Sequence, residues 1–155
     1  MLRATVFFPS VPTRRIEVVW PGGEPERGPR YVRLRGRPTE WRTKEGISIG
    51  TSLRQLERVN GRPFHLAGFG FDAGATVTSW DGGRLRSHAD AQCRLLVRVD
   101  SLPQLTPKQR ALYSQVSGDR TFSSAHPAMR ALNPRVAELL LEFPMDRSRV
   151  PGTPP

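Results

Sequence analysis

Cysteine, lysine and long apolar runs are all scarce in this chain of 155 residues. Cys93 is the single cysteine, so no disulfide can form within the chain. It begins the apolar run at residues 93–97, which predicts a small buried strand residue and not a reactive thiol. No apolar run approaches the roughly 18 residues of a membrane-spanning helix. The apolar stretch at residues 1–9 is too short for a signal peptide and ends at Pro9.

Lysine is scarce although the chain is strongly basic. Lys44 and Lys108 are the only lysines among the 24 cationic residues, and the others are arginines. The net charge of +10 indicates anionic partners such as nucleic acid, acidic lipid or acidic polymers. However, such an arginine skew is often found in proteins of GC-rich genomes, and the arginines are spread along the whole chain.

Arginine is dense at residues 27–37 alone. A candidate basic patch consists of Arg30, Arg33, Arg35 and Arg37. Within it, alternation places Arg33 and Arg35 on one face of a strand and apolar residues on the other. The favoured interpretation is a solvated sheet face, and a phosphate-binding stripe is the alternative.

The 15 prolines and 14 glycines indicate short elements separated by turns. Helices are predicted after the caps Ser52 and Thr106 and at residues 127–132. Strands are predicted at residues 4–8, 15–20, 31–35, 64–71, 76–80, 93–100 and 136–143. This order predicts one α+β domain over residues 1–143, with short helices packed on an antiparallel β-sheet as a single pair of layers. Residues 144–155 are predicted to form a proline-rich tail.

Two catalytic motifs match in letters but not in context. Residues 46–50 fit the nucleophile-elbow pattern G-x-S-x-G around Ser48, but a polar stretch precedes them where a strand is required. Residues 68–73 fit the dinucleotide pattern G-x-G-x-x-A, but a predicted strand follows where a helix must receive the phosphates. We therefore predict no catalytic residues and no cofactor.

The histidines do not suggest a metal site. His65, His88 and His126 are too far apart in sequence for any pair to have metal-ligand spacing. The acidic residues are scattered, with no paired carboxylates that would indicate acid–base catalysis. We therefore predict no metal ligands.

Several blocks of sequence together resemble an uncharacterised family of bacterial exported proteins and lipoproteins. The blocks are GISIGTSLRQLE from Gly46, NGRPF from Asn60, GFGFD from Gly68, TVTSWDGG from Thr76, and GD, FSS, PAM and LNP between Gly118 and Pro134. The resemblance covers most of residues 16–143 and implies a periplasmic or other envelope location. The chain departs from the family at Phe71 and Ala73, where tryptophan and an aromatic residue are expected. No activity is known for that family, so no catalytic residue is carried over.

A shorter pattern resembles two groups of protein-binding proteins. It runs from Ile49 through Gly50 and Thr51 to a short helix, and then to Gly61 and Pro63. The small lipoprotein of the outer-membrane barrel assembly machinery and the β-lactamase inhibitory proteins share it. Both pack short helices on an antiparallel sheet and act by binding protein, which is an analogy at the level of the fold.

These observations favour a non-catalytic binding or scaffold module of the cell envelope. Its partner would be another protein or an envelope component, and its contact surface either the exposed sheet face or residues 68–83. The candidate binding residues of that segment are Phe69, Phe71, Asp72, Trp80 and Asp81. The aromatic members would act as anchors, although core positions are the simpler interpretation. A cytoplasmic nucleic-acid-binding protein that uses its arginines is the alternative.

The family resemblance also implies a longer protein. Its members carry an export signal and a further N-terminal segment, whereas here a strand is predicted almost directly after Met1. We therefore expect this chain to be a truncated form. A missing segment would leave an apolar surface or bare sheet edge near Val6, Phe8, Val18 and Trp20.

We expect nucleic-acid binding to be non-specific, because the arginines are scattered and no stacking motif accompanies them. In titrations with single- and double-stranded DNA and RNA at physiological salt, dissociation constants should fall at about 10⁻⁴–10⁻⁶ M. Sub-micromolar binding that depends on base sequence would contradict this expectation.

Overall fold

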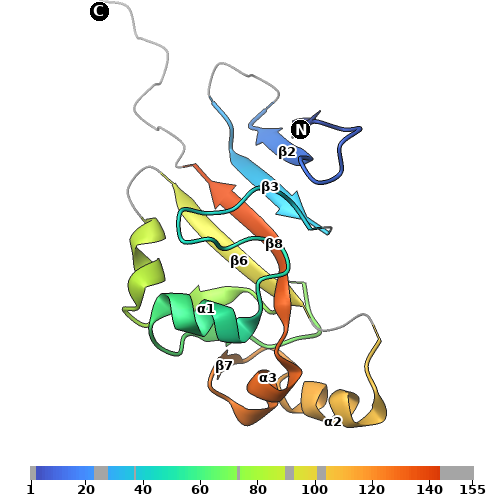
Figure 1. Cartoon of the computed structure of the whole chain (residues 1–155), viewed down its shortest axis with the longest axis vertical. Helices are drawn as coiled ribbons and strands as arrows, with labels where there is room; N and C mark the ends of the chain where they lie inside the picture. Colours follow the sequence, from blue (N-terminus) through green and yellow to red (C-terminus); the bar gives the residue numbers. More distant parts are fainter. Residues whose placement is uncertain are drawn as a thin grey trace, which may run out of the picture.

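The alternating segments form a five-stranded antiparallel sheet in the computed structural model, which describes residues 3–22, 28–36, 38–72, 74–89, 93–100 and 104–143. The strands are β1 (Arg3–Phe7), β2 (Ile16–Trp20), β3 (Tyr31–Arg35), β6 (Arg94–Asp100) and β8 (Arg135–Glu142). They lie in the order β1-β2-β3-β8-β6 (Figure 1). Because β8 lies between β3 and β6, this late strand joins strands β1, β2 and β3 to β6. The tail at residues 144–155 and Arg37 lie outside the described residues.

A second, three-stranded sheet is joined to the first. Its strands are β4 (His65–Ala67), β5 (Val77–Ser79) and β7 (Thr121–Ser123), in the order β5-β4-β7. The sheets meet where the amide of Val99 donates to the carbonyl of Ala75 at 3.0 Å. Strand β7 lies outside the predicted strands, because three residues are too few for alternation to show.

The helices are short. They are α1 (Leu53–Asn60), η2 (a 3₁₀ helix, Arg84–Ala89), α2 (Pro107–Gln115) and α3 (Pro127–Leu132). Helices α1 and α2 begin directly after the predicted caps Ser52 and Thr106. Ser52 Oγ accepts from the amide of Gln55, and the Gln55 side chain accepts from the amide of Ser52, so the predicted capping box is confirmed. Gly61 ends α1 with φ of 80°, a left-handed conformation that suits glycine. None of the described helices is long and apolar enough to cross a membrane.

The architecture is α+β, with short helices on antiparallel sheet, as the sequence predicts. The strand expected at residues 64–71 is shorter, because β4 ends at Ala67. Beyond it, the amide of Phe69 donates to the carbonyl of Val116 at 2.9 Å, which draws the chain out of the ladder with β5.

The core fills the space between the two sheets, α1 and α3. Leu53 and Leu56 of α1 are completely buried, as is Phe64 just before β4. They pack with a cluster of aliphatic residues from both sheets, including Leu66, Val77, Val97, Val99, Val136 and Leu139. Burial of these side chains at roughly 25 cal/mol per Å² is the main stabilising term of the fold.

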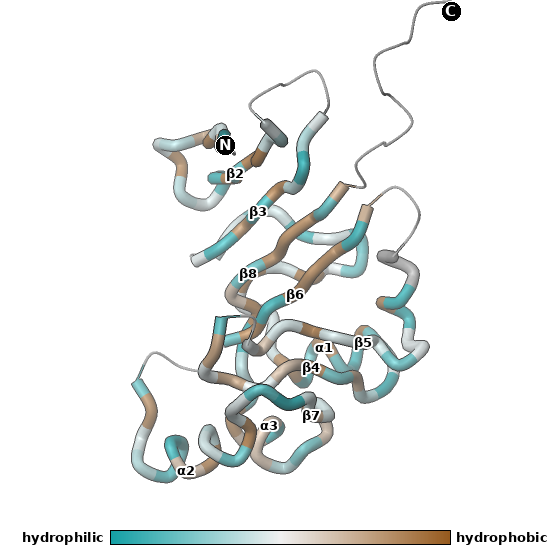
Figure 2. Tube along the Cα trace, turned by 180° about the vertical axis from the view of Figure 1, so that it is seen from behind, coloured by the Kyte–Doolittle hydropathy of each residue, from teal (hydrophilic) through white to brown (hydrophobic). Residues whose placement is uncertain are grey.

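The five-stranded sheet has two chemically different faces. The strand register places Ile16, Val18, Val32, Leu34, Leu95, Val97, Leu139 and Leu141 on one side, which we name the apolar face. The other side, the charged face, carries Glu17, Arg33, Arg35, Arg94, Arg98 and Glu138 together with Leu96 and Leu140. Seen from behind in Figure 2, no described helix passes in front of β3, β8 and β6. The charged face is therefore the open one, and α1 and its neighbours cover part of the apolar face.

A buried asparagine holds α1 to the neighbouring loops. Asn60, with 1% of its surface exposed, donates to the carbonyls of Arg62 and Trp80 at 2.9 and 3.0 Å. Its Oδ1 accepts from the amide of Leu85 at 3.2 Å. Gly83 passes so close that a Cβ there would lie 2.1 Å from Oδ1, so the contact requires glycine.

We expect Asn60→Ala to lower the free energy of unfolding by about 2–4 kcal/mol, because it leaves buried backbone groups unpaired. Urea unfolding followed by circular dichroism would measure this. Arg58→Ala, on the exposed side of the same helix, serves as the control and should change stability by less than about 0.5 kcal/mol. Equal effects of both substitutions would show that the asparagine has no special role.

Candidate ligand-binding groove

A cleft on the apolar face has a volume of about 630 Å³. Its floor consists of side chains from four strands: Ile16, Val32, Leu34, Leu95, Leu139 and Leu141. Apart from Leu139, these side chains are half-buried, so the face is incompletely covered here. The volume falls within the roughly 300–1,000 Å³ of small-molecule sites, which are also mainly apolar.

The wall of the groove is the loop between β3 and α1. In Figure 1 this loop crosses in front of β8 and β6, and residues 41–45 line the groove together with the side chains of those strands. A tight turn fixes its shape, because the amide of Gly46 donates to the carbonyl of Thr43 at 2.9 Å. The hydroxyl of Thr43 accepts from the amide of Ile47, a core residue that anchors the end of the loop. Hydrogen bonds within the loop thus fix the local shape of the wall.

Trp41 fixes the loop to the turn between β1 and β2. Its indole Nε1 donates to the carbonyl of Arg14 at 2.8 Å, and its ring lies 6.5 Å from that of Phe8. The amide of Glu40 donates to the carbonyl of Thr13 at 2.8 Å. With 38% of its surface exposed, Trp41 also contributes an aromatic wall to the groove.

Charged side chains of the loop lie at the rim. Arg42 and Lys44 are exposed, and neither forms an ion pair with a described residue. Glu45 also lines the groove and is half-buried. Cys93 is half-buried, lies just before β6 and lines the groove, so the prediction of a buried strand residue was wrong.

Two members of the predicted basic patch are paired with an acidic residue. On the charged face, Glu17 accepts from Arg33 Nε and Nη2 at 2.9 and 2.6 Å, and Arg15 and Arg35 lie within 3.6 Å of it. Burial would raise the pKa of Glu17, but the hydrogen bond and charge of Arg33, with the charges of Arg35 and Arg15, hold it below its usual range. Arg30 is exposed and precedes β3, outside this cluster. The arginines therefore surround a carboxylate and do not form an uninterrupted cationic stripe.

The predicted binding residues of the segment 68–83 are spread over different environments. Phe69 is 2% exposed and stacks on Tyr113, with ring centroids 4.9 Å apart. Trp80 is half-buried against Phe64, with centroids 5.0 Å apart. Half-buried Phe71 and exposed Asp72 line a separate cleft of about 430 Å³ beside Arg98, Asp100 and Tyr113. The structure thus does not bring the aromatic residues together on one surface.

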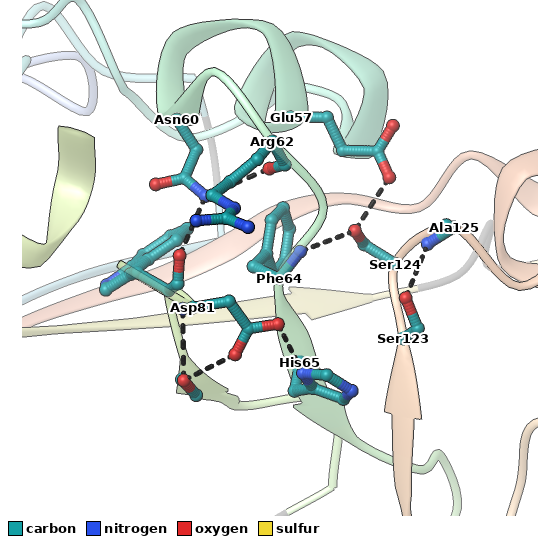
Figure 3. Close-up of polar contacts among 11 residues, drawn as sticks. Glu57, Asn60, Arg62, Phe64, His65, Asp81, Ser123, Ser124 and Ala125 are labelled. Carbon is teal, nitrogen blue, oxygen red and sulfur yellow. Dashed lines mark hydrogen bonds and ion pairs between the residues drawn. The ribbon is translucent and has the colours of Figure 1, made fainter. Parts of the chain in front are cut away.

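Asp81 forms a polar cluster with His65 and Ser79 beside the second sheet. Figure 3 shows its contact with His65. Its two carboxylate oxygens contact Nδ1 of His65 and the hydroxyl of Ser79, the latter at 2.7 Å. The hydrogen bond from Ser79, aided by His65 and the charge of Arg62, outweighs a small effect of burial and lowers the pKa of Asp81. In a catalytic triad the histidine lies between serine and aspartate, whereas here the aspartate is in the middle. His65 therefore does not activate Ser79 in this arrangement.

Ser48, from the nucleophile-elbow pattern, and Ser124 both have structural partners. Ser48 Oγ donates to the carbonyl of Trp41 at 2.7 Å, so it closes the loop that forms the groove wall. Ser124 is completely buried, accepts from the amide of Phe64 and donates to Glu57 at 2.7 Å (Figure 3). Among the described residues, no three His, Cys, Asp or Glu side chains are grouped to hold a metal ion.

The surfaces expected to be bare near the N-terminus are partly covered. Val18 is 8% exposed, and half-buried Trp20 donates from Nε1 to Thr5 at 3.0 Å. Phe8 is 40% exposed, although the guanidinium of Arg14 lies 4.6 Å from its ring centre.

Comparison with known proteins gave no match of the chain to any family model, curated protein or solved structure.

Glu17 should contribute a pH-dependent part of the stability. In the folded protein the pKa of Glu17 is lowered from its usual 4.5. The ionised carboxylate therefore stabilises the fold above pH 4.5, and this stabilisation is lost as the pH falls through the lowered pKa. We expect Glu17→Gln to have a lower Tm than the parent protein at pH 7, and the difference to shrink towards pH 3. Glu40→Gln, which removes a carboxylate whose side chain is 64% exposed, is the control and should show little difference at either pH. A Tm difference for Glu17→Gln that is the same at both pH values would contradict the assignment.

Proposed function

We propose that this protein is a non-catalytic binding module of the bacterial cell envelope, and that the groove on its apolar face holds the hydrocarbon part of an envelope component. The observation that carries the proposal is an apolar cleft of about 630 Å³ with a wall fixed by hydrogen bonds. A preformed apolar cleft favours binding, because little conformational freedom is lost when the ligand enters.

The polar groups of the groove support a binding role. The hydroxyls of Thr43 and Ser48 form hydrogen bonds to backbone groups of the loop. The floor consists of aliphatic side chains from β2, β3, β6 and β8. Such a surface gives affinity by excluding water from apolar groups.

The envelope location rests on the resemblance of residues 46–53 and the later blocks to exported bacterial proteins. The nucleic-acid alternative has less support, because Arg33 and Arg35 share the carboxylate of Glu17. Because these charges are already paired, a partner bound through apolar contacts in the groove has more support than a nucleic acid bound to the arginines.

The test uses the apolar fluorescent probe N-phenyl-1-naphthylamine, whose emission rises when it leaves water. We expect Leu95→Gln and Leu141→Gln each to weaken binding of the probe about tenfold, because each replaces an aliphatic side chain of the floor with a polar amide. Leu96→Gln and Leu140→Gln are matched controls, since they change neighbouring residues of the same strands on the charged face. The controls should bind the probe like the parent protein.

Thermal unfolding of all four variants separates loss of the groove from loss of the fold. No saturable binding to the parent protein, or equal weakening by substitutions on both faces, would refute the proposed site.

A further inference from the structure

We propose that the ligand of the groove is a long-chain fatty acid, with its acyl chain on the apolar floor and its carboxylate beside Arg42 and Lys44. This inference rests on the proposed function and adds the chemical class of the ligand. It follows from what the floor lacks, from the charges at the rim and from the shape of the cleft.

The floor suits a hydrocarbon chain better than a peptide. Strands β3 and β8 are each paired with a neighbour on both sides, so their backbone donors and acceptors are used within the sheet. A peptide laid across this floor would bring amide and carbonyl groups that need partners, and burying them unpaired is unfavourable. An acyl chain brings no such groups, and its methylenes match the side chains of Val32, Leu95 and Leu141.

The rim suits an anionic headgroup. Arg42 and Lys44 are both exposed on the loop that forms the wall, and neither is neutralised by an ion pair to a described residue. Glu45 also lines the groove but is half-buried, so the two cations dominate the accessible rim. On the charged face, by contrast, Arg33 and Arg35 are held by Glu17. The rim cations are therefore available to a carboxylate.

The cleft suits a single chain that enters from solvent. Its volume of about 630 Å³ lies in the range of small ligands, and one wall is the loop whose cations face solvent. An amphiphile can then bury its chain while the carboxylate stays hydrated at the rim, which avoids the cost of burying a charge.

The experiment measures displacement of N-phenyl-1-naphthylamine by decanoate, dodecanoate and tetradecanoate, each below its micelle concentration. Affinity should rise up to about fourfold per added methylene until the groove is filled. Dodecan-1-ol, which has the same chain without the charge, should bind more weakly than dodecanoate. Dodecyl phosphate tests whether the rim prefers a phosphate.

A double variant, Arg42→Gln with Lys44→Gln, tests the rim. It should weaken dodecanoate about fivefold and leave dodecan-1-ol unchanged, because exposed charge pairs contribute little each. The control is Arg58→Gln with Lys108→Gln, which removes the same charge from exposed positions on α1 and α2. Since Cys93 lines the groove, dodecanoate should also slow its alkylation by N-ethylmaleimide, which reports occupancy at this place in the fold.

The possible failures differ in what they overturn. If dodecan-1-ol binds as tightly as dodecanoate and the rim variant changes neither affinity, the fatty-acid inference is wrong, but the proposed apolar binding groove is not contradicted. A much tighter dodecyl phosphate would replace the fatty acid by a phosphate amphiphile. If the probe binds but no amphiphile displaces it or protects Cys93, the fatty-acid inference also fails. If the probe itself does not bind, both the proposed function and the fatty-acid inference are wrong.

Discussion

The apolar face of the five-stranded sheet extends beyond what the short helices cover, and a hydrogen-bonded loop closes part of the remainder. The loop is held across the sheet by contacts to the β1–β2 turn, chiefly from Trp41 to Arg14 and from Glu40 to Thr13. Without these contacts the aliphatic floor would face water. The groove exists because the loop spans the sheet without filling the space beneath it.

The same strands place opposite chemistry on their two faces. Alternation sends the aliphatic residues of β3 to the groove and its arginines to the open side, where Glu17 lies among Arg15, Arg33 and Arg35. Charges in such a cluster balance one another locally. The net charge of +10 therefore does not identify a binding face.

Polar side chains form hydrogen bonds that join α1 to neighbouring segments. Asn60 joins α1 to the loops around it, and Ser124 joins β4 to Glu57. Arg130 adds a contact to Glu57 at 3.1 Å. Because these groups bond to one another and to the backbone, their roles are structural.

Local patterns in the sequence were sufficient to predict the α+β class, the capping box at Ser52, the N-cap at Thr106 and most strand positions, because these depend on alternation and on hydrogen bonds between near neighbours. It also placed Arg33 and Arg35 on the same face of β3. It could not show that Glu17 lies beside them or that Cys93 lines a groove with Trp41, since strand order joins segments distant in the chain. Those neighbours were decided by the tertiary structure, because burial of the whole apolar face selects which strands pair and which loop covers them.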